Sequence, residues 1–154
     1  MDWKTIETQP DADSLLSRFG DFHDGCIREA HLWTGHWLNS DRSMSVDAGL
    51  DNRIRILIQC SWPKAAAIEL WFEEITRFNL VPAPENYDSI IFGAVMLVRD
   101  GIIYWSPEDR IELPEALLDD TELGNDYTWI TARKLQWREV DWLGQELRYG
   151  AKGE

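Results

Sequence analysis

The stretch NRIRILIQC, Asn52 to Cys60, is the clearest β-strand signal in the chain. The apolar side chains of this stretch are Ile54, Ile56, Ile58 and Cys60, and mostly polar side chains alternate with them. A period of two places the two sets on opposite faces of a strand. We therefore expect one face to meet the core and the other to be largely polar, which is typical of an antiparallel sheet.

Further strands are predicted on both sides of this stretch. Residues 68–72 alternate in the same way, whereas 89–98 is apolar on both faces and indicates a central strand. Asp100-Gly101 is a hairpin signal, because both residue types suit a left-handed turn. The expected strands cover residues 26–37 with a bulge near Gly35, 44–46, 52–60, 68–72, 89–98, 102–105 and 129–137.

Short helices are predicted near both ends of the chain. Residues 11–19 carry an apolar stripe after Asp11 or Asp13, either of which would cap the helix, and Gly20 ends it. Residues 140–149 suit a terminal helix. The expected fold is mainly β, an antiparallel sheet or β-sandwich of about seven strands with short N- and C-terminal helices. The alternative is an α+β fold, in either case as a single domain over residues 1–154.

The charge balance limits the class of partner. With 28 acidic and 15 basic residues the formal net charge is −13. Nucleic acid and anionic membrane surfaces are disfavoured, because both bind basic patches. No apolar run reaches the about 18 residues of a membrane helix, and the N-terminus lacks a signal-peptide pattern. Since two cysteines make no disulfide framework, we expect a reduced, cytoplasmic protein with no membrane or nucleic-acid partner.

Residue types that perform catalysis or bind metals do not occur at productive spacings. His23 and His31 are about 26 Å apart on an extended strand, and His36 is on its other face. Glu69 and Glu73 share a strand face at about 13 Å, beyond the about 9.5 Å limit for paired glycosidase carboxylates. The chain also lacks a Gly-x-Ser-x-Gly motif. We therefore expect no catalytic residue, no metal and no cofactor, and a protein that is not an enzyme.

Phe22-His23-Asp24 forms a turn-like entry to the first long strand. Asp24 is expected to accept backbone N–H groups in the turn. His23 is expected to bridge to a neighbouring strand, and Phe22 to fill the core. A structural role for this motif is favoured over a role as a binding site, because buried polar groups are normally hydrogen-bonded.

The stretch FHDGCI, residues 22–27, resembles the Phe-His-Asp-x-x-(Ile/Val) opening of a loose group of small bacterial proteins. Residues 68–75 are similar to the second block of that group, Leu-x-Phe-x-x-Val, and the likeness covers residues 20–98. The group is mostly uncharacterised, and some members are assigned as immunity proteins of polymorphic toxin systems. The resemblance implies binding of another protein rather than catalysis.

The acidic segment 108–126 is the partner-binding surface that the sequence favours. It contains eight acidic residues and one basic residue, and a tryptophan lies on each side of it. Protein interfaces commonly combine an aromatic centre with a charged rim. The predicted partner-binding residues are Trp105, Glu112, Glu115, Asp119, Asp120, Glu122 and Trp129. The competing interpretation is a solvated acidic loop.

Two classes of function are consistent with these features. The first is a non-enzymatic binding protein, in its specific form an immunity protein that neutralises a basic toxin domain, with charge steering the association. The second is a carbohydrate or small-ligand binding domain that uses the nine tryptophans, since an indole offers apolar faces and an N–H donor. The oligomeric state stays open at this level.

Overall fold

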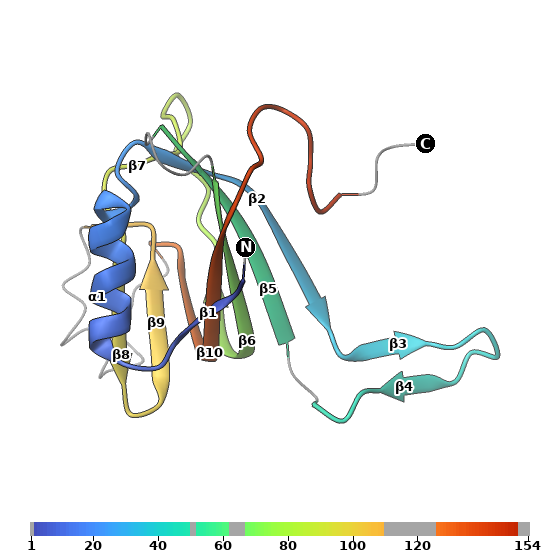
Figure 1. Ribbon diagram of the computed structural model, residues 1–154. Helices are drawn as coiled ribbons and strands as arrows, with labels where there is room; N and C mark the ends of the chain where they lie inside the picture. The colour runs from blue at the N-terminus through green and yellow to red at the C-terminus, as the bar shows by residue number, and fades with distance from the viewer. Residues whose placement is uncertain (1, 50–51, 62–66, 110–125, 151–154) are drawn as a thin grey trace.

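The computed structural model describes residues 2–49, 52–61, 67–109 and 126–150. The fold is mainly β, as the alternation predicts. One curled antiparallel sheet carries a helix on one face and an irregular C-terminal segment on the other, and a two-stranded arm extends away from this body (Figure 1). Among the described residues, the body contains one sheet with no second sheet packed against it, which favours the predicted sheet over the predicted sandwich. Within the described residues, no helix is long and apolar enough to cross a membrane.

Strands β5 (Asn52–Cys60) and β6 (Ala67–Asn79) lie in the middle of the sheet, and the bounds of β5 match the prediction. Across the described sheet, seven strands including these two lie in the order β7-β2-β5-β6-β10-β9-β8. Strand β1 pairs in addition with part of β10. All pairings are antiparallel. The other strands of this sheet are β1 (Lys4–Ile6), β2 (Gly25–Thr34), β7 (Ile90–Ile91), β8 (Val95–Arg99), β9 (Ile102–Ser106) and β10 (Trp129–Val140).

The core lies between one face of the sheet and helix α1 (Gln9–Arg18). Ile54, Ile56 and Ile58 of β5 are buried there, as their spacing predicts. Leu15 of α1 and Phe72 of β6 are buried in the same cluster. Each such side chain contributes about 1.5–3 kcal/mol when it leaves water. This face therefore supplies most of the stability of the sheet.

Helix α1 begins two residues before the predicted start and has a different cap. The N-cap is Thr8, whose side chain accepts the N–H of Asp11, while the Asp11 carboxylate accepts the N–H of Thr8 at 2.8 Å. This reciprocal pair is a capping box. Asp11 is therefore the third helical residue, and the prediction that Asp11 or Asp13 is the cap is wrong, because Thr8 is the residue with the extended backbone of a cap.

Residues 89–98 form two short strands instead of the predicted central strand. Strands β7 and β8 lie at opposite edges of the sheet. In β8, Met96 is buried in the main core, where the Gln9 side chain of α1 donates to its carbonyl at 3.1 Å. Val95 and Leu97 instead pack against Trp129 in a second apolar cluster. Both faces of β8 are covered by apolar side chains. The strand is therefore apolar on both faces although it lies at the edge of the sheet and not at its centre.

The predicted C-terminal helix is absent. Strand β10 continues to Val140, and residues 141–150 are irregular. The Gln59 side chain of β5 donates to the carbonyls of Trp142 at 3.0 Å and Gly144 at 3.3 Å. The Glu29 carboxylate of β2 accepts the backbone N–H groups of residues 148 and 149. Backbone groups that a helix would pair internally are thus bound to the sheet, which satisfies them without a helix.

Strands β3 (His36–Leu38) and β4 (Met44–Val46) form a separate antiparallel pair. These strands and their turn, residues 36–46, are called the arm. The predicted return strand at 44–46 is confirmed. The bulge predicted near Gly35 is instead at Arg28, where the register between β2 and β5 shifts by one residue.

Candidate functional site

The face of the sheet opposite α1 carries aromatic and charged side chains. The strand register places His31 of β2, Arg55 of β5 and Trp71 of β6 next to one another in one row across this face. The adjacent row contains Glu69 of β6, which is fully buried. Four half-buried aromatic side chains meet around the half-buried Arg55, and the five residues are called the aromatic–arginine cluster: Trp3, Trp33, Arg55, Trp71 and Tyr149.

Arg55 lies at the centre of this cluster. The distances from its Cζ to the ring centroids are 4.7 Å for Trp71, 5.8 Å for Trp33, 5.8 Å for Tyr149 and 5.9 Å for Trp3. The rings also contact one another, and the Trp3 and Trp71 centroids are 5.3 Å apart in an edge-to-face arrangement. A guanidinium within about 6 Å of an aromatic ring is attracted by its quadrupole. The cluster therefore holds a cation between aromatic side chains.

Two N–H donors of the cluster have no acceptor. Arg55 Nε and Trp71 Nε1 are both buried, and neither has a hydrogen-bond partner within the part of the chain that the structure describes. The two residues are direct neighbours across β5 and β6. Most buried donors in proteins are paired, so an unpaired one calls for a specific explanation.

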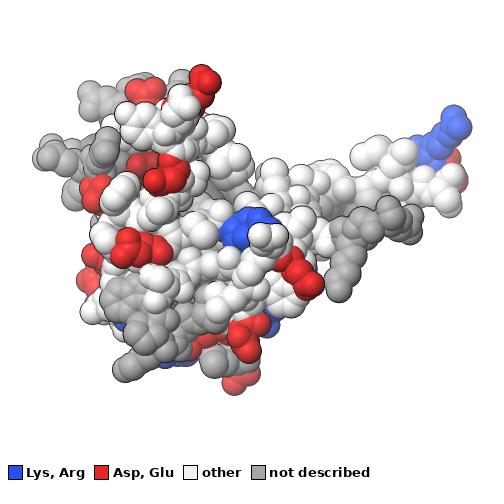
Figure 2. Space-filling model, turned by 90° about the horizontal axis from the view of Figure 1, so that it is seen from above, with Lys and Arg blue, Asp and Glu red and all other residues white. Residues whose placement is uncertain are grey.

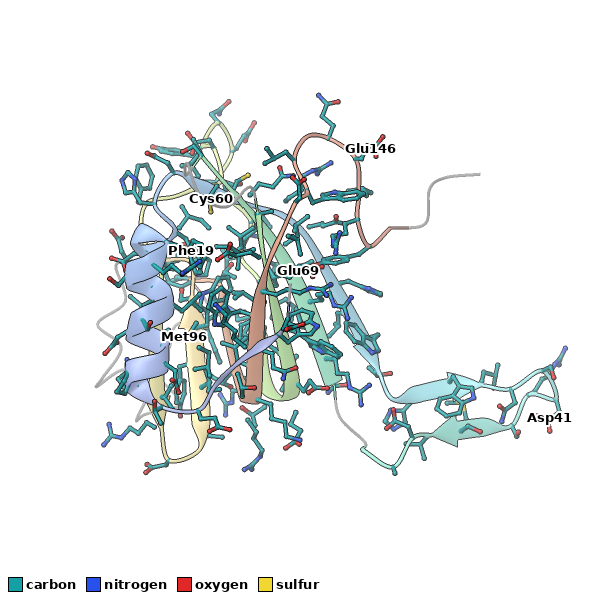
Figure 3. All side chains as sticks on the ribbon, in the orientation of Figure 1. Phe19, Asp41, Cys60, Glu69, Met96 and Glu146 are labelled. Atoms are coloured by element: carbon teal, nitrogen blue, oxygen red, sulfur yellow. The ribbon has the colours of Figure 1, made fainter. Side chains whose placement is uncertain are left out.

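Glu69 organises the neighbouring row. Its carboxylate accepts hydrogen bonds from Arg138 Nε at 2.5 Å, Arg148 Nε at 2.7 Å and the Tyr149 hydroxyl at 2.9 Å. Arg138 belongs to β10, whereas Arg148 and Tyr149 belong to the C-terminal segment. Figure 3 shows Glu69 on the side of the sheet that faces this segment. Glu69 therefore attaches the segment to the sheet and positions Tyr149 beside Arg55.

The surroundings of Glu69 also control its protonation. Burial by itself raises the pKa of the Glu69 carboxyl, but hydrogen bonds from Arg148, Arg138 and Tyr149 outweigh burial and leave the pKa below its ordinary value. Burial raises the pKa of the Tyr149 hydroxyl, and the negative charge of Glu69 raises it further. Near neutral pH the carboxylate is ionised and the phenol keeps its proton to donate.

The arm has an uncovered apolar face. His36 pairs with Val46 and Leu38 with Met44, so these side chains share one face of the hairpin. Leu38 is 60% exposed, Met44 69% and Val46 48%. Figure 2 shows the arm projecting from the body, so the sheet does not cover this face. An exposed apolar patch on a projecting element is typical of an interaction site.

Polar contacts define the turn of the arm. Asn39 accepts a hydrogen bond from Trp37 Nε1 at 3.0 Å and donates to the Ser43 hydroxyl at 2.9 Å. The Asp41 carboxylate accepts the Ser43 N–H at 2.9 Å, and Figure 3 places Asp41 at the far tip. These bonds fix the turn, but a two-stranded hairpin is marginally stable in water on its own. Covering its apolar face would stabilise it.

The edge of β2 that leads into the arm is open. Strand β7 pairs only with Gly25 and Cys26 of β2. Among the described residues, no strand pairs with the outer edge of β2 between Ile27 and Thr34. Such an edge presents free backbone donors and acceptors to which another strand can add. The arm and this edge are therefore one continuous surface that is open to another chain.

The two tryptophans of the partner-binding surface predicted from the sequence are buried. Trp105 is 1% exposed and packs against Phe72 with centroids 5.9 Å apart. Trp129 is 7% exposed and belongs to the second apolar cluster. Neither ring is therefore available to a partner. The acidic residues of that prediction lie outside the described residues: Glu112, Glu115, Asp119, Asp120 and Glu122.

The Phe22-His23-Asp24 motif follows α1. Phe22 is fully buried and stacks on Phe19 with centroids 6.2 Å apart. Asp24 was expected to accept backbone N–H groups, but the partner that the described structure gives its exposed carboxylate is His23 Nδ1 at 3.2 Å. Asp24 has a φ of 60°, in the left-handed region, and its own backbone N–H donates to the carbonyl of Ile91. The turn is therefore joined to β7 by the backbone of Asp24 and not by its carboxylate. The motif thus attaches β7 to the sheet through its backbone.

The three histidines lie apart in the structure. His23 is beside Asp24 and the ring of Phe92, the His31 ring lies tilted beside that of Trp33, and His36 is on the arm. Within the described part of the chain, no group of three or more His, Cys, Asp or Glu residues is close enough to hold a metal ion. We identify no residue set in the described structure that would hold a cofactor.

Sequence reasoning did not single out Arg55 or the arm. The polar face of NRIRILIQC did show Arg55, but the rings around it come from the N-terminus, β2, β6 and the C-terminal segment, so no local pattern reports them. For the arm there was a signal. Apolar residues at 37, 38, 44 and 46 flank the polar turn 39–43, which is typical of a hairpin.

Comparisons with family models, curated proteins and solved structures find no match to this chain. The function therefore has to be inferred from the geometry of the chain itself. Two features stand out for that purpose. One is the apolar arm with the open edge of β2, and the other is the aromatic–arginine cluster on the sheet.

Proposed function

We propose that this chain is a non-enzymatic binding protein that docks on a partner protein through its arm and the open edge of β2. The observation that carries the proposal is the uncovered apolar face of the arm, formed by Leu38, Met44 and Val46. A partner that covers this face removes apolar area from water, which favours the complex.

The open edge of β2 adds directional contacts to this apolar burial. A strand of the partner that pairs alongside residues 27–34 would form main-chain hydrogen bonds. The side chains of β2 would then contribute specificity, because successive residues point to opposite faces. Leu32 on this strand is 53% exposed and extends the apolar surface from the arm onto the body.

Charge indicates the kind of partner. The chain carries a formal net charge of −13, and Figure 2 shows acidic side chains spread over the surface of the body seen from above. A field of this sign accelerates association with a basic protein. We therefore propose a basic protein domain as the partner. In its most specific form, which the resemblance to immunity proteins supports, the chain neutralises a basic toxin domain.

A second candidate function has an observation of its own. The aromatic–arginine cluster exposes parts of Trp3, Trp33 and Trp71 on one face of the sheet. Half-buried tryptophans combine an apolar surface with a polar N–H and are common in ligand sites. This favours binding of a small ligand on the sheet, separate from the arm.

Affinity capture from native lysate tests the first proposal. The wild-type chain is compared with Leu38→Ser/Met44→Ser and with a matched control, Leu80→Ser/Leu143→Ser, which changes two leucines of similar exposure, 61% and 63%, on the body. We expect a stoichiometric basic protein with the wild type and the control, and loss of that protein with the arm variant. Equal capture by all three chains would show that the arm is not the docking element.

The salt dependence of the captured complex separates charge steering from apolar burial. Interactions between exposed charges are screened beyond about 8 Å at physiological ionic strength. We expect the association rate with the captured partner to fall as salt rises, and the dissociation rate to respond mainly to the arm substitutions. An association rate that does not change with salt would show that charge does not steer the association, and would contradict a basic partner.

A further inference from the structure

Arg55 differs from the other arginines on the same face of the sheet. Arg138 and Arg148 are both paired with Glu69, at 2.5 Å and 2.7 Å. Arg53 lies 3.7 Å from Glu73. Arg55 contacts four aromatic rings, and no carboxylate among the described residues forms an ion pair with it. Its positive charge is therefore surrounded by aromatic rings and not neutralised by a neighbouring acid.

Aromatic rings do not replace an acceptor. A cation over a ring is attracted to the ring face, but its N–H groups still require hydrogen-bond acceptors. Arg55 Nε has none, and the same holds for Trp71 Nε1 beside it, within the described chain. Any acceptor would satisfy these two unpaired donors, and an acceptor that carries negative charge would in addition neutralise Arg55.

We propose that Arg55 and Trp71 bind an oxyanion, the carboxylate or phosphate group of a small molecule that also carries a flat apolar group. The planar guanidinium presents a fork of N–H donors that matches these anions. Trp71 Nε1, on the ring whose centroid lies 4.7 Å from Arg55 Cζ, is the second unpaired donor of the cluster within the described chain. The half-buried rings of Trp3 and Trp33 then provide surfaces on which a flat apolar group would stack.

The C-terminal segment forms one side of this site. Tyr149 contacts the Arg55 guanidinium with its ring and donates its hydroxyl to Glu69 at 2.9 Å. The Glu69 carboxylate is occupied by its three donors, so it does not compete for Arg55. The inference rests on the small-ligand function proposed above for the same cluster. The site uses no residue of the arm, so its test is independent of the protein partner.

Two other indoles provide a matched comparison. Trp105 Nε1 and Trp129 Nε1 are also buried and have no acceptor in the described structure. Among the described residues, no Lys or Arg side chain lies over either ring. An unpaired indole N–H alone is thus not a ligand site, and it is the combination with Arg55 that indicates an anion.

The test follows the indole N–H resonances of the ¹⁵N-labelled full chain, with Trp71 assigned from the signal that disappears in Trp71→Phe. The probes are indole-3-acetate, phenyl phosphate and the uncharged indole-3-acetamide. We expect a saturable shift of the Trp71 signal with one or both anions and none with the amide. The anion that produces the shift identifies the carboxylate or the phosphate as the ligand class.

Variants then test the role of each group. Arg55→Gln should weaken binding of the active anion by at least about tenfold, because a charge-assisted hydrogen bond is lost. Arg55→Lys, which keeps the charge without the fork, should give an intermediate affinity. Trp129→Phe removes an unpaired indole N–H elsewhere and should bind like the wild type.

Three results would overturn the site. One is the absence of any shift with both anions, which would assign the two donors to ordered water. Another is an equal shift with indole-3-acetamide, which would show stacking without anion recognition. The third is unchanged affinity in Arg55→Gln or, if that variant does not fold, in Arg55→Lys.

Discussion

The two faces of the sheet are made by the same strands but have opposite character. Toward α1, β5 and β6 contribute Ile56, Leu70 and other apolar side chains to one closed core. Away from α1, the same strands contribute Arg55, Glu69 and Trp71, which contact charged and aromatic side chains. The first face excludes water through apolar packing, whereas the second is held by specific hydrogen bonds and ion pairs.

This difference separates stability from recognition within one sheet. The apolar face buries side chains whose contribution depends on area and packing and needs no particular direction. The polar face depends on direction, because each hydrogen bond and ion pair has a preferred geometry. Substitutions on the two faces should therefore differ in size and in their response to pH.

The largest effect is expected on the apolar face. Phe72→Ala should lower the free energy of unfolding by about 3–5 kcal/mol, because it leaves a cavity beside Trp105 in a closed core. Trp71→Ala, its neighbour on the opposite face, should cost about 1–2 kcal/mol because a half-buried site leaves no closed cavity. Urea unfolding followed by circular dichroism measures both. Equal costs would contradict the division between the faces.

An intermediate effect is expected at Glu69. Glu69→Gln should lower the free energy of unfolding by about 2–3 kcal/mol, since Arg138 and Arg148 lose their shared carboxylate but keep some contact with water. The control Glu74→Gln alters an exposed pair with Lys134 and should change stability by less than about 1 kcal/mol. A cost at Glu69 no larger than that of the control would mean that Glu69 does not hold the C-terminal segment.

The same variant should change the response to acid. The pKa of Glu69 in the folded chain lies below its ordinary value of 4.5, so the folded state binds the proton less tightly than the unfolded state. Its contribution to stability is present above the unfolded pKa and is lost as pH falls through the folded pKa. The wild type should therefore lose more stability below pH 4.5 than Glu69→Gln. Parallel curves would exclude a depressed pKa.

The smallest effect on folding is expected in the arm. Leu38→Ser/Met44→Ser changes side chains that are 60% and 69% exposed. Such substitutions should leave the unfolding free energy within about 0.5 kcal/mol of the wild type. Thermal unfolding checks this result before the capture experiment is interpreted. A large loss of stability would mean that the arm packs against the body and is not a free docking surface.

Residues that alternate over a long stretch could be placed from the sequence. The pattern of residues 52–60 predicts β5 with its bounds, and Asp100-Gly101 marks the hairpin between β8 and β9, where both residues have positive φ. These features are local, since a period of two and a left-handed turn depend on neighbouring residues only. The mainly β class follows from several such stretches.

Tertiary contacts decided the positions of the segments relative to one another. Residues 141–150 have a helical pattern, but Gln59 and Glu29 bind their backbone groups and hold them across the sheet. Residues 89–98 divide between two edges because β7 pairs with β2 and β8 pairs with β9, and two separate apolar clusters cover the faces of β8. A sequence pattern does not report which distant side chain will satisfy a backbone group.

The sequence by itself determined that this is a mainly β chain with a strongly negative charge and many tryptophans. Only the tertiary structure decided that four aromatic side chains surround Arg55 and that the apolar residues of the arm remain uncovered. The physical reason is that alternation assigns a residue to a face, whereas a site requires residues from several strands in one register. That register is set by the packing of the whole sheet.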